Sequence, residues 1–364
     1  MRLHNLENRS KQGYTSFGSV WDKGEVKKGE FSLTNGEGKP IPLQTRITAR
    51  WPDGSVKWAS HTADAALMGD TVTVEPAREG PGEASSAALE GRPLARQENG
   101  CYLVDTGRLS ARIPRAEAAF LAENISLDGT NIVPKIFPVL NIENRKTKGD
   151  TEYTEDTVYR GTVHSVRLVE NGPLLCVFRF EGTHRKGETD GRASWPFTAL
   201  LYFYAQSSQI RCVYTFFYDG YEERDFLKGM GLWFDTRLSG APYQRHVKFL
   251  TDNTKDGESI CFHEAAVIMN SINPKLPPRA LEDQMAGAVK RYPEGSGEDL
   301  AARDLPVWNR YSLCQDSPGH FLIRKQTGDG CCAIDCMHGK RAPGGMAVSG
   351  ENGGIVVAQK DFWQ

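Results

Sequence analysis

Apolar and polar residues alternate in short runs along most of this chain, whereas helical periodicity is short and rare. Alternation with a period of two is typical of β-strands that bury one face. Turn dipeptides separate the runs, at Asn35-Gly36, Asp53-Gly54, Asp128-Gly129, Asp219-Gly220 and Asp256-Gly257. Such pairs favour tight turns between strands, so the pattern predicts an all-β protein.

The first part of the chain predicts a small β-domain. Its candidate strands are short and cover residues 29–33, 43–50, 56–63 and 71–75. Residues 77–97 are rich in Gly, Pro, Ala, Ser and Glu and contain few large apolar side chains, as linkers between domains do. We therefore expect an N-terminal domain over residues 1–96 and a second domain over residues 97–364.

The second region predicts longer strands, which suit a large antiparallel β-sandwich. The candidates cover residues 102–106, 109–113, 158–170, 174–181, 197–204, 210–218 and 230–234, and then residues 310–313, 321–325, 345–348 and 355–359. A looser insert is expected at about residues 274–306, with one helical segment near residues 278–288.

Residues 49–61 predict a hairpin with unusual side chains. Pro52-Asp53-Gly54 favours a tight turn, because proline presets φ and glycine accepts a positive φ. The flanking strands carry two tryptophans, Lys57 and His61. Exposed aromatic and cationic groups suit an anionic sugar, but a buried tryptophan, a solvated lysine and a histidine at a barrel rim explain the same residues.

Composition excludes some classes of function. The 364 residues are 39% hydrophobic and 25% charged, as in ordinary globular proteins, and a net charge of −2 gives no support to nucleic-acid binding. No apolar run approaches the length of a membrane span, and residues 1–10 lack the apolar core of a signal peptide. We therefore expect a cytoplasmic location, with neither a membrane nor a nucleic acid as partner.

The cysteines do not define a metal site. Cys176 and Cys212 lie in apolar runs and are expected to be small core residues. Cys332, Cys336 and His338 invite a metal interpretation, but no second pair of cysteines completes a tetrahedral site. No acidic loop has strong calcium spacing, so calcium stays open only as an unsupported alternative. The eight cysteines are therefore expected to be free thiols, and no cofactor is expected.

Three long segments carry a resemblance to a known family. Residues 50–58 read Arg-Trp-Pro-Asp-Gly-Ser-Val-Lys-Trp, and residues 24–29 and 41–44 precede them. Residues 210–232 and 339–364 provide further motifs, including Asp-Phe-Leu-Lys-Gly-Met-Gly and the final Asp-Phe-Trp-Gln. Together these segments resemble the exo-rhamnogalacturonan lyases, which form polysaccharide lyase family 26, and their bacterial relatives.

The resemblance implies a small N-terminal β-barrel of the swapped-hairpin (RIFT) type, then a central β-sandwich and a C-terminal (α/α) toroid. In the family, the Asp-Phe-Trp-Gln run lies where the sandwich meets the toroid, and this sequence ends there. The toroid is therefore an expected partner outside this chain. The resemblance also implies an acidic oligosaccharide or polysaccharide as the ligand.

Lyases that act on uronates work by β-elimination. A cation neutralises the carboxylate, a base removes the adjacent proton, and an acid protonates the leaving oxygen. His184 is predicted to be the base or the acid, because it precedes a long polar loop at a strand end. Tyr218, favoured over Tyr202, is its predicted partner, and Lys228, Arg185 or Arg341 is predicted to neutralise the carboxylate.

Further residues are predicted to bind the substrate. Arg160 and Lys325 are candidate carboxylate ligands, like Arg185 and Arg341, and His61 is a candidate in the barrel. Tyr202 shares a strand face with Tyr204 and, with Arg211, could line a sugar-binding surface. Phe216 and Phe217 are instead expected in the core.

Three functions remain open at this point. The chain is predicted to be a lyase that acts on rhamnogalacturonan-type oligosaccharides. It could otherwise be a non-catalytic carbohydrate-binding protein, or a fragment that needs the toroid for activity. The third alternative is a structural β-protein whose surface mediates assembly.

Overall fold

The computed structural model describes residues 1–4, 13–77, 91–184, 194–240, 245–252, 262–268, 282, 286–287, 310–326 and 333–362. The chain divides into two compact units, Met1–Asp235 and Thr236–Gln364, which we call the first and the second unit. Each unit is described by itself.

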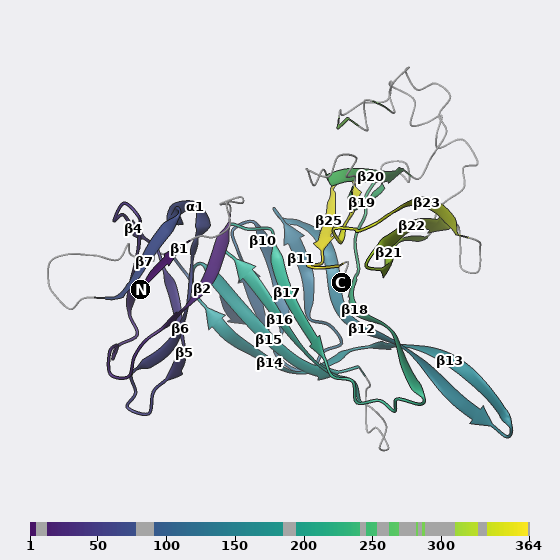
Figure 1. Ribbon diagram of the computed structural model, residues 1–364, viewed down its shortest axis with the longest axis horizontal. Helices are drawn as coiled ribbons and strands as arrows, with labels where there is room; N and C mark the ends of the chain where they lie inside the picture. The colour runs from purple at the N-terminus through teal and green to yellow at the C-terminus, as the bar shows by residue number, and fades with distance from the viewer. Residues whose placement is uncertain are drawn as a thin grey trace. The chain divides into compact units, whose positions relative to one another are not determined.

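The first unit begins with a small barrel made of two antiparallel sheets (Figure 1). One sheet has the order β1-β7-β3-β4 and the other β2-β6-β5. The apolar faces of both enclose one core, which includes Trp21, Phe31, Leu33, Ile41 and Val56. The elements are β1 (Arg2–His4), β2 (Tyr14–Val20), β3 (Phe31–Asn35), β4 (Pro40–Ile41), β5 (Gln44–Arg50), β6 (Val56–Asp64), α1 (Ala65–Met68) and β7 (Thr71–Pro76).

The hairpin predicted at residues 49–61 is confirmed as β5 and β6. These strands pair antiparallel, and Gly54 in the turn has a φ of +86°. The register shifts around Ala49, which interrupts the simple alternation of faces. Trp58 is therefore half exposed, and the ammonium of Lys57 lies 4.4 Å from the ring centre of Trp51 and 5.2 Å from that of Trp58.

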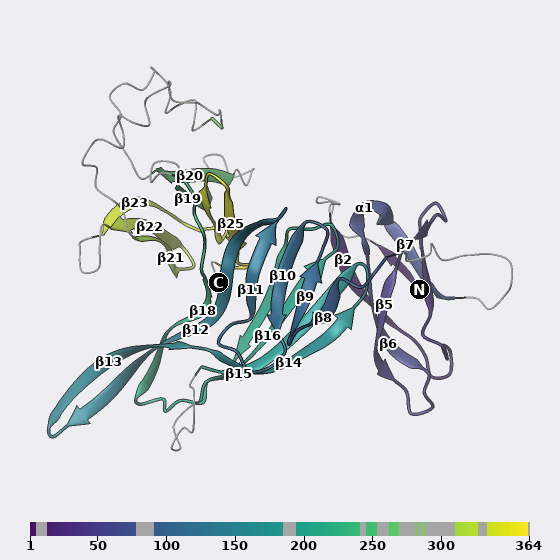
Figure 2. The same ribbon diagram turned by 180° about the vertical axis from the view of Figure 1, so that it is seen from behind.

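Two further antiparallel sheets complete the first unit as a sandwich (Figures 1 and 2). In one sheet, β12 pairs with β18 along one edge and with β11 and then β13 along the other. Its strands are β8 (Ala95–Glu98), β9 (Cys101–Asp105), β10 (Leu109–Pro114), β11 (Ala122–Leu127), β12 (Thr130–Lys148), β13 (Thr151–Arg160) and β18 (Asp225–Phe234). The other sheet has the order β14-β15-β16-β17, from β14 (Thr162–Asn171), β15 (Leu175–Thr183), β16 (Pro196–Tyr204) and β17 (Ile210–Phe216).

Strict alternation sets which face of each sheet is buried. Every second residue of β16, from Phe197 to Phe203, is buried, whereas Tyr202 and Tyr204 lie on the other face. In β12 the inward residues Leu140 and Ile142 form a cluster with Trp195. Burial of these side chains on both sheets provides most of the driving force for their packing.

The strand predicted at residues 158–170 is two strands, because the chain breaks at Gly161 between β13 and β14. The 19-residue strand β12 was not predicted. Within its second half only Leu140, Ile142 and Asn144 are buried, and residues 145–148 are exposed and mostly charged, so this half offered no long apolar pattern to recognise. Figure 1 shows that the β12–β13 hairpin continues beyond the other strands of its sheet.

The second unit contains two smaller antiparallel sheets, β20-β19-β24-β25 and β21-β22-β23. Phe249, Phe321, Ile323 and Ala342 are buried together. The strands are β19 (His246–Asp252), β20 (Phe262–Ile268), β21 (Arg310–Ser317), β22 (His320–Gln326), β23 (Ile334–Gly339), β24 (Gly345–Gly350) and β25 (Gly353–Ala358).

The expected all-β class is therefore confirmed. Most of the helix expected at residues 278–288, and of the insert at 274–306, lies outside the described residues. Within the residues that the structure describes, no helix is both long and apolar enough to cross a membrane. The domain boundary between residues 96 and 97 remains a prediction; β7 ends at Pro76 and β8 begins at Ala95.

Candidate functional site

His184, at the end of β15, has both ring nitrogens engaged in hydrogen bonds and is only 1% exposed. Its Nδ1 lies 2.8 Å from the carbonyl oxygen of Trp195, and its Nε2 is hydrogen-bonded to the hydroxyl of Tyr214. Because a carbonyl only accepts, Nδ1 carries the proton and the Tyr214 hydroxyl donates to Nε2. Burial lowers the pKa of His184 and raises that of Tyr214. The ring is a neutral member of a buried network.

Trp195 holds this network in place through a strained backbone. Its φ is +52°, which is rare for a bulky side chain. The carboxylate of Asp219 accepts from the Trp195 amide at 2.8 Å and from the Ser194 amide and hydroxyl, both at 2.9 Å. Gly220 makes room for the indole, since a Cβ there would lie 2.1 Å from the ring. The Asp219 carboxylate therefore fixes the carbonyl that His184 binds.

Tyr218 was predicted to act with His184 as the acid or base, and the hydroxyl bound to His184 Nε2 is instead that of Tyr214. The Tyr218 hydroxyl donates to the carbonyl oxygen of Asp225 at 2.5 Å, and its ring packs edge-on against Trp195 at 5.2 Å. Tyr214 takes the predicted place, because β17 points residues 214 and 216 inward. Phe217 points outward and is 64% exposed, so the expectation that it lies in the core was wrong.

Lys228 occupies a β-bulge. Asn141 of β12 pairs with Gly229, but the next residue, Ile142, pairs with Leu227, so Lys228 is the extra residue on β18. Its ammonium lies 2.9 Å from the carboxylate of Glu143. That contact raises the pKa of Lys228 and lowers that of Glu143.

Arg160 lies on the same outer face of this sheet. Its guanidinium carbon is 4.9 Å from the ring centre of Phe137 and 5.5 Å from that of Trp233. Trp233 is 49% exposed. In the described part of the chain, no carboxylate forms an ion pair with Arg160. The guanidinium is therefore held by aromatic rings and keeps its charge available.

A strip of open surface connects these two cations. Gly229 and Gly231 lie between Lys228 and Trp233, and a Cβ at either glycine would meet nothing within 4 Å. Across the sheet, Gly231 pairs with Val139, which pairs with Arg160. We call Arg160, Trp233, Gly231, Gly229 and Lys228 the outer strip.

The predicted pairing of Tyr202 with Arg211 is present on the other sheet. The guanidinium carbon of Arg211 lies 5.1 Å from the ring centre of Tyr202, and the two residues face each other across β16 and β17. Both are on the outward face, as the alternation indicated.

His61 is fully buried in the barrel rather than placed at its rim. It is hydrogen-bonded to Ser19 Oγ at 2.7 Å and to Thr45 Oγ1 at 2.8 Å, and the ring of Phe31 packs against it. Burial lowers the pKa of His61 to about 4. This position offers no open path to a substrate, so the substrate-binding role proposed from the sequence has no support from its surroundings.

The low pKa of His61 predicts an acid-sensitive barrel. An unfolded histidine titrates near pH 6.5, so its contribution is complete above that pH and is lost as the pH falls toward about 4. The loss from this group is about 3 kcal/mol of unfolding free energy. Urea unfolding at pH 7 and pH 4 is expected to show a smaller difference in His61→Gln than in the wild type. Equal differences would contradict this prediction.

The remaining predicted residues lie elsewhere. Lys325 is on β22 and Arg341 follows β23, both in the second unit, and the Nε of Arg341 donates to the carbonyl of Pro318 at 3.3 Å. Arg185 lies outside the described residues, as do Cys331 and Cys332. Among the residues that the structure does describe, no group of three His, Cys, Asp or Glu side chains is arranged to hold a metal ion.

The fold defines a class: an all-β protein with a small barrel followed by a β-sandwich. The sequence matches the model of the PcRGLX-like N-terminal RIFT barrel domain over residues 1–77. It matches the model of the PcRGLX-like protein central beta sandwich domain over residues 94–364. The chain belongs to this PcRGLX-like family, and the resemblance to rhamnogalacturonan lyases found in the sequence is confirmed.

A curated relative is described only as the "Uncharacterized protein YetA" of Bacillus subtilis (strain 168). The two sequences are 29% identical over 354 residues, which is 96% of this chain and 39% of the relative. This chain therefore spans about two fifths of the length of that relative.

Trp233 of the outer strip, and Glu143 beside Lys228, escaped the sequence analysis. Trp233 lies within the short apolar run 232–234 and was assigned only to a strand, and Glu143 lies in the unpredicted strand β12. The spacing Gly229-Met230-Gly231 within a strand was an available signal, because glycine in a strand interior often marks close approach by a ligand.

Proposed function

We propose that this chain recognises uronate-containing oligosaccharides of the rhamnogalacturonan type and belongs to a lyase that cleaves them by β-elimination. The observation that carries the proposal is the outer strip. One sheet face carries a half-exposed indole, open surface at Gly229 and Gly231, and a guanidinium that pairs with no carboxylate of the described residues. Aromatic rings pack against sugar faces, and arginine binds carboxylates in a two-pronged contact.

The chemistry assigns different tasks to the two cations. Neutralising a substrate carboxylate requires a positive charge that no protein carboxylate already offsets. Arg160 meets this condition, whereas Lys228 is bound to Glu143. We propose Arg160 as the carboxylate ligand and retain Lys228, Tyr218 and His184 as proposed catalytic residues. His184 would act through Tyr214, the hydroxyl that its Nε2 binds.

Non-catalytic carbohydrate binding is the second candidate function of this chain. The burial of His184 and the engagement of both its nitrogens favour it, because a general base must reach the proton that it removes. The proposals share the outer strip and differ only in whether a product forms.

Adding a side chain at Gly231 is the sharpest test of the outer strip. Gly231→Val adds bulk into open space on a strand where valine is favourable, so the fold is expected to persist. Binding of rhamnogalacturonan oligosaccharides, measured by calorimetry, is expected to weaken at least about tenfold, a loss of about 1.4 kcal/mol or more. Trp233→Ala is expected to give a similar loss.

Gly319→Val is the matched control. A Cβ at Gly319 also meets nothing within 4 Å, and this residue lies in the second unit. Unchanged binding in Gly231→Val, or equal losses in both valine variants, would contradict the proposal. Ultraviolet absorbance of an unsaturated uronate product separates the two functions: product from this chain supports the lyase, and binding without product supports the non-catalytic alternative.

A further inference from the structure

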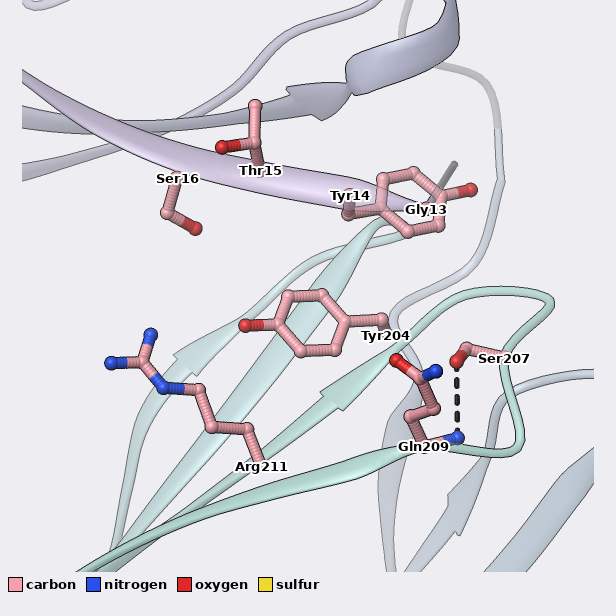
Figure 3. Close-up of a pocket in the computed structure, with 8 residues that line it drawn as sticks. All are labelled: Gly13, Tyr14, Thr15, Ser16, Tyr204, Ser207, Gln209 and Arg211. Atoms are coloured by element: carbon pink, nitrogen blue, oxygen red, sulfur yellow. Dashed lines mark hydrogen bonds between the residues drawn. The ribbon is translucent and has the colours of Figure 1, made fainter. Parts of the chain in front are cut away.

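A polar pocket lies where the barrel meets the sandwich within the first unit (Figure 3). Its volume is about 330 Å³, at the lower end of the range for small-molecule sites. Strand β2 contributes one wall, and the β16–β17 hairpin contributes the other. The lining residues are Gly13, Tyr14, Thr15, Ser16, Tyr204, Ser207, Gln209 and Arg211.

The two tyrosines form an aromatic side to the pocket. The rings of Tyr14 and Tyr204 are parallel within 5°, with centres 6.2 Å apart. This spacing is that of a stacked pair, so a ligand ring packs beside them rather than between them. Burial raises the pKa of both phenols, so both hydroxyls are protonated at neutral pH and can donate hydrogen bonds.

The opposite side of the pocket carries a positive charge. Figure 3 shows the guanidinium of Arg211 directed toward the space beside the Tyr204 hydroxyl, with the Ser16 hydroxyl facing it from β2. Of the residues described, no carboxylate pairs with Arg211, whose guanidinium instead lies over the Tyr202 ring. The nearby Glu170 is already bound by Arg46 at 3.0 Å. The pocket therefore has one uncompensated cation.

A single buried amide fixes the two walls relative to each other. Gln44 of β5 donates to Glu170 Oε1 at 2.7 Å and to the Leu175 carbonyl at 2.9 Å, and its oxygen accepts from the amides of residues 174 and 175. Leu175 is the register partner of Tyr204. Thr62 is the register partner of both Gln44 and Ser16. Both walls are thus connected through Gln44, which makes the pocket preformed.

We infer that this pocket binds one carboxylated sugar unit, with the carboxylate on Arg211 and the sugar ring against Tyr204. The cation selects an acidic group, the hydroxyls and the Gln209 amide match sugar hydroxyls, and the small volume limits the ligand to about one unit. The choice of a uronate rests on the proposed function. The pocket lies on the barrel-side sheet, separate from the outer strip, and is a second binding site. The unit is either a free monosaccharide or the end of an oligosaccharide.

Ligand-observed NMR and calorimetry with galacturonate and its methyl ester test the inference on the full chain. The wild type is expected to bind galacturonate, and the neutral ester at least about tenfold more weakly. Arg211→Ala is expected to lose about tenfold or more of galacturonate affinity. Tyr204→Phe, which keeps the ring and removes one hydroxyl, is expected to weaken binding less.

Arg167→Ala is the matched control, because Arg167 is exposed on the same sheet and pairs only with Glu181 at 3.4 Å among the described residues. No binding of galacturonate or of a galacturonate oligosaccharide to the wild type, equal affinity for acid and ester, or equal losses in both arginine variants would overturn the inference. Binding of the oligosaccharide but not of the monosaccharide, with a component that Arg211→Ala removes and Gly231→Val keeps, identifies a chain end as the ligand of the pocket. The part of galacturonate binding that Arg211→Ala removes is expected to persist in Gly231→Val, so failure of the outer strip and failure of this pocket give different results.

Discussion

His184→Ala is expected to lower the free energy of unfolding of the first unit by about 3 to 4 kcal/mol. The substitution leaves a cavity beside Phe197 and Phe216, which pack against the imidazole. It also removes the partner of the Tyr214 hydroxyl and leaves the Trp195 carbonyl with only the backbone amide of residue 184. The cavity removes packing contacts. A buried polar group without a hydrogen bond carries the full free-energy cost of its desolvation. Denaturant unfolding followed by tryptophan fluorescence measures the change, since Trp195 is in the same network.

His164→Ala provides the comparison for this prediction. His164 is exposed on β14 and is hydrogen-bonded to Thr183 Oγ1 at 2.8 Å, so its loss is expected to change stability by less than about 0.5 kcal/mol. A similar small effect in His184→Ala would show that the network is not structural. Loss of lyase activity in His184→Ala does not by itself assign a catalytic role, because the variant is expected to be destabilised. His184→Gln, whose side-chain amide can both donate and accept hydrogen bonds, separates the two explanations if it folds stably and still lacks activity.

Gln44→Ala is expected to destabilise the first unit by about 3 kcal/mol or more. It is also expected to abolish ligand binding in the polar pocket between barrel and sandwich, which we call the junction pocket. The amide makes four hydrogen bonds between the barrel and the sandwich, and one of them goes to the carboxylate of Glu170. Removal leaves two backbone amides and one carbonyl without their partner, and it frees the two pocket walls to move. Galacturonate binding is therefore expected to fall together with stability, while binding at the outer strip persists.

Gln97→Ala is a suitable control, because Gln97 is an exposed amide on β8 of the same unit and its loss is expected to be nearly neutral. If Gln44→Ala retained wild-type stability, the barrel and the sandwich would be held together by other contacts. If it lost stability but kept full galacturonate affinity, the amide would not be what orders the pocket.

Much of the fold follows from alternation that a single sequence displays. Residues 197–204 alternate strictly and form β16 with the predicted faces, and residues 56–63 and 71–75 lie within β6 and β7. The failures have a common physical cause. Residues 145–148 of β12 are exposed and, among the described strands, pair only with β13, so backbone pairing rather than burial makes this end of β12 a strand.

The site was less accessible to sequence reasoning than the fold. Residue types singled out Arg160 and Lys228 as candidate carboxylate ligands, and these two lie on one sheet face. Tyr214 was passed over for Tyr218 because a strand pattern does not reveal where β17 ends. His61 and His184 are similar to exposed histidines in sequence, and only the packed structure distinguishes buried imidazoles from reactive ones.

The position of Gln44 has a consequence for the order of folding. The strands β14 to β17 pair with their neighbours in sequence, so each forms over short chain separations. The Gln44–Leu175 contact instead joins residues 131 positions apart, and closing such a loop is slow. The barrel and the sandwich are thus expected to form separately and to dock last. A ligand of the junction pocket would bind only molecules that have completed docking, and so would report the final step of folding.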